Sequence, residues 1–238
     1  MVKRMLLAAP VPDPGPTGPY GTMPWLRATV SRFANGETHA RRRALVEGML
    51  AEMEPAALRE EAAELARAAA ARPGDAARPG DAARPGDAAR PGDAARPGEA
   101  ARPGDAARPD DAYLPVAVLA RRLGARDLAA AVAATRVVAA AYQPHTSHPD
   151  ADDALARLLE LLPGGDEEVV AGRVAILVQA CEATAGLVRG EDVPVPVTRR
   201  VGPEGEIVTV SLATCPFGAG PRRCPGEAHA RALVEGLR

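Results

Sequence analysis

The stretch Phe217-Gly-Ala-Gly-Pro-Arg-Arg-Cys-Pro-Gly226 decides how the rest of the chain is interpreted. It joins one cysteine to two arginines and three glycines, just before a predicted C-terminal helix. A thiolate at Cys224 is expected to be stabilised by Arg222 and Arg223 and by backbone N–H groups at the helix start. The glycines allow the backbone to turn tightly and to approach a flat ligand closely. Such a sulfur is a good soft ligand for iron.

The pattern Phe-Gly-x-Gly-x-Arg-x-Cys-x-Gly resembles the haem-binding loop of the cytochrome P-450 superfamily, and all six defining residues are present. The resemblance implies that Cys224 is the proximal iron ligand of haem b, with Gly226 in the same motif. It also implies that Arg222 pairs with a haem propionate and that Phe217 packs beside the sulfur. The alternative is a glycine-rich loop with an inert cysteine, although inert cysteines usually lie buried away from basic residues.

Two further basic segments fit the same family. His39 and Arg43 are four residues apart and share one helical face, so together they can clamp a carboxylate. The resemblance to the family's C helix assigns them to the haem propionates, whereas an exposed basic helix start is the alternative. The segment 194–200 resembles the strand after the family's K helix, where an arginine reaches a propionate. Arg199 is the candidate, with Arg200 left open.

The segment 177–187 resembles the family's I helix, which crosses the distal face of the haem. Aligned on Thr-Ala-Gly-Leu, Glu182 occupies the acidic position and Thr184 the second hydroxyl position. Ala183 stands where the family has the threonine credited with guiding protons to oxygen. Glu182 and Thr184 are therefore the catalytic candidates, as organisers of water for proton delivery. The alternative is a buried helix with a stray glutamate.

A hexapeptide repeat, Arg-Pro-Gly-Asp-Ala-Ala, fills residues 72–111. Proline in every unit excludes a continuous helix or central strand, and glycine at every sixth position excludes a collagen helix. Composition predicts a disordered, electrically neutral insertion, and a dedicated binding function is the alternative. The expected organisation is a helical N-terminal part (1–71), this low-complexity tract (72–111) and a helical haem-binding part (112–238).

Hydrophobic periodicity predicts that the remaining chain is mainly helical. The expected helices cover 37–53, a segment from Pro55 onward, 114–123, 128–142, 151–162, 167–189 with Asp166 as its cap, and 227 to the end. Segments 193–201 and 206–212 are rich in Val, Ile and Thr, and the turn residues between them predict a β-hairpin. The fold class is thus mainly α with a small β-hairpin. The resemblance makes it a compressed cytochrome P-450-like fold.

The compression is considerable. Only residues 190–193 separate the I-helix-like segment from the strand that follows, so the family's J and K helices are missing together with their Glu-x-x-Arg pair. The meander before the cysteine loop is missing as well, because Leu212 almost adjoins Phe217. We therefore expect a more exposed haem and a poorly enclosed substrate pocket.

Composition narrows the class of protein. The 29 basic and 31 acidic residues nearly balance, so no electrostatic footprint points to nucleic acid or to an anionic membrane. Three cysteines at unrelated spacings make neither a disulfide framework nor a zinc pattern, which favours a reducing compartment. Pro10 interrupts the first apolar run, and no later stretch was expected to span a bilayer. A cytoplasmic protein is the default expectation.

These observations lead to one main functional hypothesis and two alternatives. The main one is a haem-thiolate monooxygenase-like oxidoreductase in which iron bound by Cys224 activates O2 or peroxide to oxidise a small organic substrate. A ferredoxin-type protein is the expected electron donor. The first alternative is a non-catalytic or partner-activating haem-binding relative that has lost the K-helix machinery. The second is a scaffold that acts through the repeat tract.

Overall fold

The computed structural model describes residues 2–71 and 111–238, so the repeat tract except Asp111 lies outside the described residues. Helices dominate, with one two-stranded sheet, so the coarse fold class predicted from the sequence is confirmed. The α-helices are α1 (Val2–Ala8), α2 (Met23–Thr29), α3 (Gly36–Ala51), α4 (Pro55–Ala71), α5 (Leu114–Arg122), α6 (Leu128–Ala140), α7 (Ala151–Leu161), α8 (Glu167–Val188) and α9 (Glu227–Gly236). Three 3-10 turns are η1 (Ser31–Phe33), η2 (Asp111–Tyr113) and η3 (Gly220–Arg222).

The helix ends expected from periodicity lie within two residues of the helix ends in the structure. Side-chain caps fix several of these ends: Asp166 Oδ1 accepts a hydrogen bond from Glu168 N at 2.9 Å, and Asp127 Oδ1 accepts one from Ala130 N at 3.0 Å. The helices α1 and α2 were not predicted. Both have seven residues, too few to show a helical period in the sequence.

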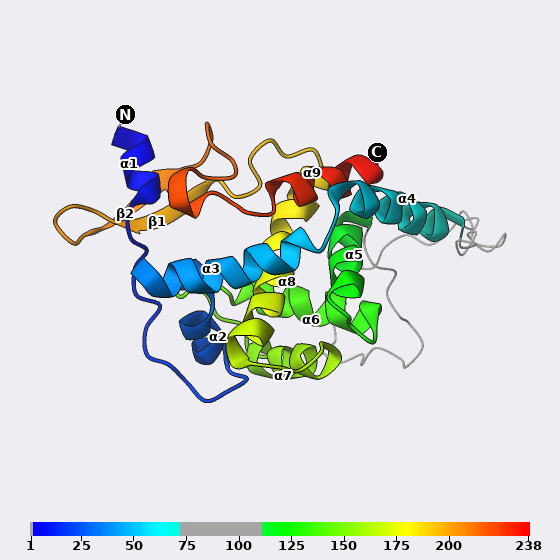
Figure 1. The fold of residues 1–238 in the computed structure, drawn as a ribbon, viewed down its shortest axis with the longest axis horizontal. Helices are drawn as coiled ribbons and strands as arrows, with labels where there is room; N and C mark the ends of the chain where they lie inside the picture. The colour runs from blue at the N-terminus through cyan, green and yellow to red at the C-terminus, as the bar shows by residue number, and fades with distance from the viewer. Residues whose placement is uncertain (1, 72–110) are drawn as a thin grey trace, which may run out of the picture.

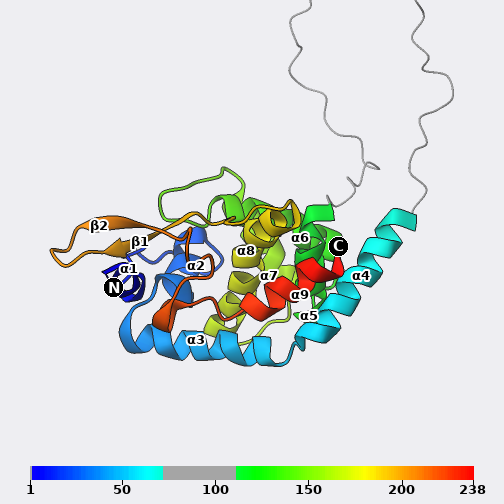
Figure 2. The same cartoon turned by 90° about the horizontal axis from the view of Figure 1, so that it is seen from above.

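Helix α8 forms the centre of the core. It packs against α3, α5, α6 and α9, and Figures 1 and 2 show it between the blue α3 and the green α5 and α6. Leu177 and Val174 on this helix are fully buried, as are Leu155 and Leu158 on α7. Gly172 lets α3 approach closely, because an added Cβ would lie 3.2 Å from Met49 Cε. The core therefore gathers elements from both sides of the repeat tract.

Helix α8 also has the length and apolarity of a membrane span, contrary to the expectation that no stretch has them. However, 67% of its most apolar window is buried inside the protein. This burial is typical of a core helix, because apolar side chains all round a helix need apolar neighbours on every side.

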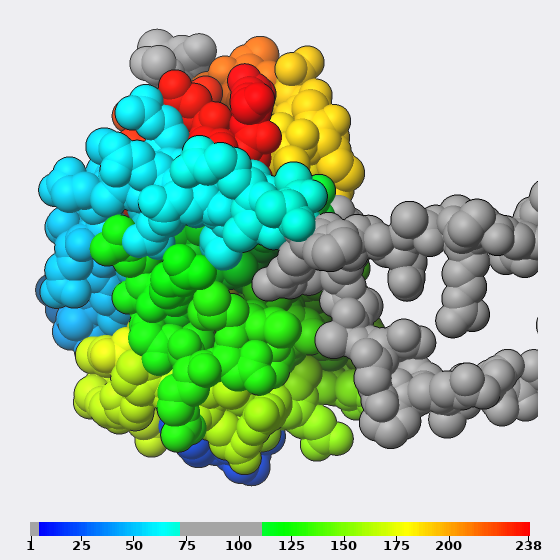
Figure 3. Space-filling view, turned by 90° about the vertical axis from the view of Figure 1, so that its right-hand side faces the viewer, coloured from blue at the N-terminus to red at the C-terminus, as the bar shows by residue number. Residues whose placement is uncertain are grey.

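Helix α9 packs along α4 and holds the C-terminus against the core. Figure 3 shows α4 in cyan lying over the green α5, with the red α9 beside it. The two helix backbones meet at Gly236, where an added Cβ would come within 2.2 Å of Arg59 O. Leu233 on α9 is fully buried. The start of α9, which follows the cysteine loop, is thereby fixed relative to the core.

The hairpin consists of β1 (Val197–Val201) and β2 (Ile207–Ser211), which pair antiparallel with Arg199 opposite Thr209. It is shorter than predicted but has the expected turn between the strands. The N-terminal segment ties the hairpin to the rest of the protein, because Val201 N donates to Pro10 O at 2.9 Å. Leu7, Val210 and Leu212 form a small second apolar cluster there. The hairpin leads directly into the cysteine loop.

Candidate functional site

The cysteine loop is closed by backbone hydrogen bonds. Cys224 N donates to Phe217 O at 2.7 Å, and Gly218 N donates to Cys215 O at 2.8 Å. Gly218 has a φ of +75°, and an added Cβ would lie 3.3 Å from Arg222 O. This left-handed conformation and the close approach explain why the position needs glycine. The fold of the loop therefore follows from the same glycines that define the sequence pattern.

Cys224 lies just before α9 with its side chain exposed and in no disulfide. Enough protein surrounds the sulfur that desolvation raises the pKa of the thiol above its ordinary value. The backbone N–H of Gly226 acts in the opposite direction, as does the positive charge of Arg43 and Arg32, and Glu227 reinforces the rise. The net direction differs from the expectation that adjacent arginines stabilise the thiolate. By itself the protein holds Cys224 as a thiol.

The two adjacent arginines do not offset this burial effect on the Cys224 pKa, because their side chains bond to other partners. Arg222 Nη2 donates to Ala34 O at 2.9 Å and to Asn35 Oδ1 at 2.6 Å. Arg223 donates to Glu227 through Nε at 3.1 Å and through Nη2 at 2.7 Å. Arg222 therefore joins the cysteine loop to the junction between η1 and α3.

A set of basic side chains gathers beside the loop, and we call it the cationic cluster. Its members are Arg32, His39, Arg43, Arg200 and Arg222. Burial lowers the pKa of His39, and the charges of Arg222 and Arg43 lower it further. Burial followed by repulsion from Arg32 and Arg43 lowers the pKa of Arg222. These mutual effects show that side chains far apart in the sequence act on one another at one place.

The cationic cluster has little compensating negative charge. Glu47 accepts a hydrogen bond from Arg43 Nε at 2.7 Å. Arg32 makes no hydrogen bond or ion pair with any described residue, and the bonds of Arg200 and Arg222 go to neutral groups. Half-buried cations normally have anionic partners, because desolvation makes an isolated charge costly. The cluster is thus suited to a bound anion.

Of the two neighbouring arginines on β1, the structure places Arg200 in the cluster. Arg200 is 5% exposed, and burial together with Arg32 and Arg222 lowers its pKa to about 10. Arg199, the candidate from the sequence, lies on the opposite, exposed face of the strand with its Nη1 3.2 Å from His145 Nδ1. Arg199 thus lies outside the cationic cluster, and Arg200, which the sequence left open, lies within it.

The two catalytic candidates on α8 make other contacts. Glu182 is exposed, and its Oε1 accepts a hydrogen bond from Tyr113 Oη at 2.9 Å, while its Oε2 lies 3.8 Å from Arg189 Nη2. Thr184 is buried and its Oγ1 donates to Ala180 O at 2.8 Å, within the same helix. The contacts of Glu182 hold η2, where the chain leaves the repeat tract. These hydrogen bonds give both residues structural roles.

The remaining loop residues support its position. Arg231 Cζ lies 4.8 Å from the centre of the Phe217 ring, which is half-buried. Gly226 caps α9, and an added Cβ there would lie 3.8 Å from Leu50 Cδ1. His229 Nε2 lies 2.9 Å from Leu50 O, so the start of α9 is bound to the end of α3. Arg32 and Asn35 were missed at the sequence level, because neither belongs to a recognisable motif.

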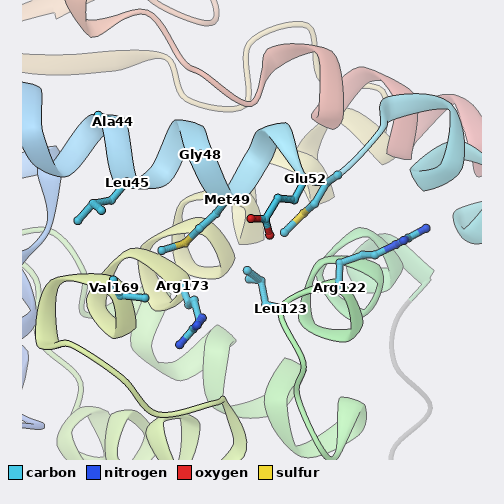
Figure 4. A pocket seen from close by; sticks show the side chains of 10 residues that line it. Ala44, Leu45, Gly48, Met49, Glu52, Arg122, Leu123, Val169 and Arg173 are labelled. Carbon is cyan, nitrogen blue, oxygen red and sulfur yellow. The ribbon is translucent and has the colours of Figure 1, made fainter.

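A cavity of about 540 Å³ opens between α3, α5 and α8. Figure 4 shows Met49 and Leu123 pointing into it, while the charged ends of Arg122 and Arg173 point away from its centre. A second cavity of about 100 Å³ lies beside the hairpin. Neither is lined by Cys224 or by Glu182 or Thr184.

The residues fit a haem on its proximal side. Among residues 2–71 and 111–238, no group of three or more His, Cys, Asp or Glu side chains could hold a bare metal ion. A single thiol such as Cys224 would need iron whose other ligands come from a macrocycle. His39, Arg43 and Arg222 of the cationic cluster suit the propionates of such a macrocycle. The distal candidates Glu182 and Thr184, already bonded elsewhere, do not contribute to the fit.

No protein-family model matches this sequence, and neither the curated proteins nor the solved structures give a significant match.

Proposed function

We propose that this chain binds haem b through the thiolate of Cys224 and acts as a haem-thiolate, monooxygenase-like oxidoreductase with a compressed cytochrome P-450-like fold. The observation that carries the proposal is the bond of Arg222 to Asn35 at 2.6 Å, which joins the cysteine loop to the start of α3, the helix of His39 and Arg43. The segment of His39 and Arg43 and the segment of Arg222 lie more than 170 positions apart, and the resemblance assigns both to the same cofactor from two separate motifs. An inert glycine-rich loop gives no reason for this coincidence.

The electrostatics of the cationic cluster support the same proposal. Burial lowers the pKa of His39 most, and the charges of Arg222 and Arg43 lower it further, so the protonated form bears a cost that a bound anion would reduce. Haem b carries two propionates, and each charge-assisted hydrogen bond to a carboxylate contributes about 1.5–3 kcal/mol. The bonds of Arg222 to Ala34 O and Asn35 Oδ1 hold its guanidinium at this position.

The chemistry follows from the ligand. When bound, the haem supplies iron that activates O2 or peroxide, and a thiolate ligand favours O–O cleavage. Cys224 loses its proton on binding, and the Gly226 N–H and the charge of Arg43 favour the anion. A small organic molecule is the proposed substrate, with a ferredoxin-type protein or peroxide as the source of oxidising equivalents.

One observation favours a second candidate function, a haem-binding relative without oxygenase activity. Glu182 accepts a hydrogen bond from Tyr113, and Thr184 is buried and donates to its own helix, so both residues have structural contacts of their own. Peroxide-driven oxidation of a generic substrate separates the two candidates. Turnover that stops in Cys224→Ala supports the oxidoreductase, whereas stable haem binding with no turnover supports the second candidate.

Titration of the purified chain with ferric haem, followed by absorption, tests the shared part of both candidates. We expect saturable one-to-one binding that is lost in Cys224→Ala. Arg43→Gln should weaken binding at least tenfold, whereas Arg157→Gln, an exposed arginine on α7, should leave it unchanged. Binding of haem by Cys224→Ala with unchanged affinity and spectrum would overturn the assignment of the ligand.

A further inference from the structure

The smaller cavity lies where the N-terminal segment, η1, residues 143–144 and the hairpin meet. Its volume is about 100 Å³. Its apolar lining includes Val11, Phe33, Pro144 and Ile207, and its charged lining consists of Asp13, Arg32, Arg199 and Arg200. The Phe33 ring is fixed by Tyr142, whose ring centre is 5.2 Å away. The cavity thus joins an apolar wall to three guanidinium groups, of which Arg199 is the exposed one beside His145.

The Arg200 guanidinium uses only two of its three nitrogens in hydrogen bonds to described residues. Its Nε donates to Leu7 O at 3.2 Å, and its Nη1 donates to Thr198 Oγ1 at 2.5 Å and to Arg199 O at 2.8 Å. Within residues 2–71 and 111–238, Nη2 has no hydrogen-bond partner. All three acceptors are neutral, so a guanidinium that is 5% exposed keeps its full charge uncompensated.

Arg32 adds a second uncompensated charge to the same cavity. It makes no hydrogen bond or ion pair within the described part of the chain, and it is close enough to Arg200 to repel it. Asp13 also lines the cavity, but it is exposed and its Oδ1 accepts a hydrogen bond from Gly15 N at 2.8 Å. Arg32 and Arg200 face an apolar wall, and no carboxylate of the described residues bonds to either of them. The arginines suit the carboxylate of an acid, and the apolar wall suits its apolar part.

We propose that this cavity binds a small monocarboxylate with an apolar tail. Its carboxylate accepts hydrogen bonds from Arg32 and Arg200, and its tail packs against Phe33. The cavity is lined by none of His39, Arg43, Arg222 and Cys224, so this site uses Arg32 and Arg200 of the cationic cluster but none of those four residues assigned to haem. The small volume excludes large acids and admits a single ring or a short chain.

Isothermal titration of the full chain with benzoate tests the proposal, and benzamide is the matched neutral probe. We expect saturable one-to-one binding of benzoate, at least tenfold weaker binding of benzamide, and at least tenfold weaker binding of inorganic phosphate, which has no apolar tail. Arg32→Gln should weaken benzoate binding at least tenfold, and Arg157→Gln should not change it. Equal affinity for benzamide, or equal or tighter binding of phosphate, overturns the proposal.

Two further measurements use the wild-type chain, so their results do not depend on whether a variant folds. The second also distinguishes benzoate binding from haem binding. In the wild-type chain, benzoate should shift the amide resonances of Phe33 and Thr198 and leave that of Leu158 on α7 unshifted; the reverse pattern overturns the site. The affinity for benzoate should be the same within twofold before and after haem is added. If the chain takes up no haem, benzoate should still bind. Loss of benzoate binding on haem loading would assign the cavity to a propionate and overturn the proposal.

Discussion

The contact between Tyr113 and Glu182 gives a sharp test, because it decides whether Glu182 is structural or catalytic. Tyr113 Oη donates to the carboxylate at 2.9 Å, and Tyr113 is 6% exposed. A hydrogen bond to a charged group contributes about 1.5–3 kcal/mol when both groups are shielded. The Glu182 side chain is 57% exposed, so solvent screening reduces the expected value to about 1 kcal/mol.

Tyr113→Phe removes the hydroxyl but keeps the ring on which the Arg136 guanidinium lies, 4.2 Å from its centre. We therefore expect the free energy of unfolding to fall by about 1 kcal/mol, which lowers Tm by about 2–4 °C in a protein of this size. Urea titration gives the free energy directly. The double-mutant cycle with Glu182→Ala isolates the pair, and its coupling energy should also be about 1 kcal/mol.

The control is Glu60→Ala on α4, an exposed glutamate whose loss should change stability by at most about 0.5 kcal/mol. A coupling energy near zero would refute the structural role of Glu182. So would a Glu182→Gln variant that keeps wild-type stability and haem binding but loses peroxide-driven turnover, because that result assigns Glu182 to proton delivery.

Three further predictions concern the cysteine loop and the cationic cluster. Gly218→Ala should cost about 1–2 kcal/mol in urea titration and weaken haem binding, because the φ of +75° disfavours a side chain, whereas Ala219→Gly, at an extended position, should cost less. The pKa of His39 is lowered, so folding favours its neutral form: this contribution to stability is present above pH about 6.5 and is lost as the pH falls through the folded pKa. Nuclear magnetic resonance should therefore place its titration midpoint below 6.5 in the haem-free chain and higher after haem is added, and an unchanged midpoint would contradict the placement of propionates there. The pKa of Cys224 is raised, and burial raises that of Cys181 to about 12. Alkylation by iodoacetamide at pH 7 should therefore be slower at Cys224 than at free cysteine, and slower still at Cys181. Site-resolved mass spectrometry of both sulfurs checks this order.

The helices of the core could be predicted from the sequence because their signals are local. Apolar residues recur at helical spacing along α8, and Asp166 stands where a cap is needed. Helix α2 has no such signal, since it contains seven residues and a proline in its first turn. Its Thr22 cap, with Oγ1 3.4 Å from Trp25 N, is a short-range feature within a proline- and glycine-rich segment.

The choice between Arg199 and Arg200 shows where local pattern fails. Val197 and Val201 share the face of Arg199, so alternation alone would bury Arg199. The structure instead buries the face of Thr198 and Arg200, because Leu7 from the distant N-terminal segment packs there and its carbonyl accepts a bond from Arg200. Only the tertiary contact decides which face of this strand is covered.

The electrostatics of Cys224 depended on tertiary contacts in the same way. Sequence adjacency suggested that Arg222 and Arg223 stabilise the thiolate. In the structure Arg222 binds Asn35 and Arg223 binds Glu227, while Arg43 from α3 acts on the sulfur. The sequence motifs thus name candidate residues, whereas the partners of each charge, Asn35 and Arg32 among them, depend on tertiary contacts.

The reduced carbon-monoxide difference spectrum of the haem-loaded chain tests the central claim most directly, because the position of its Soret band reports the ligand opposite the carbon monoxide. We predict a thiolate-type Soret band for the wild type and for Cys215→Ser, whose cysteine lies outside the motif. The band should vanish in Cys224→Ala. A wild-type spectrum without a thiolate band, or one that persists in Cys224→Ala, would contradict the assignment of Cys224 as the iron ligand.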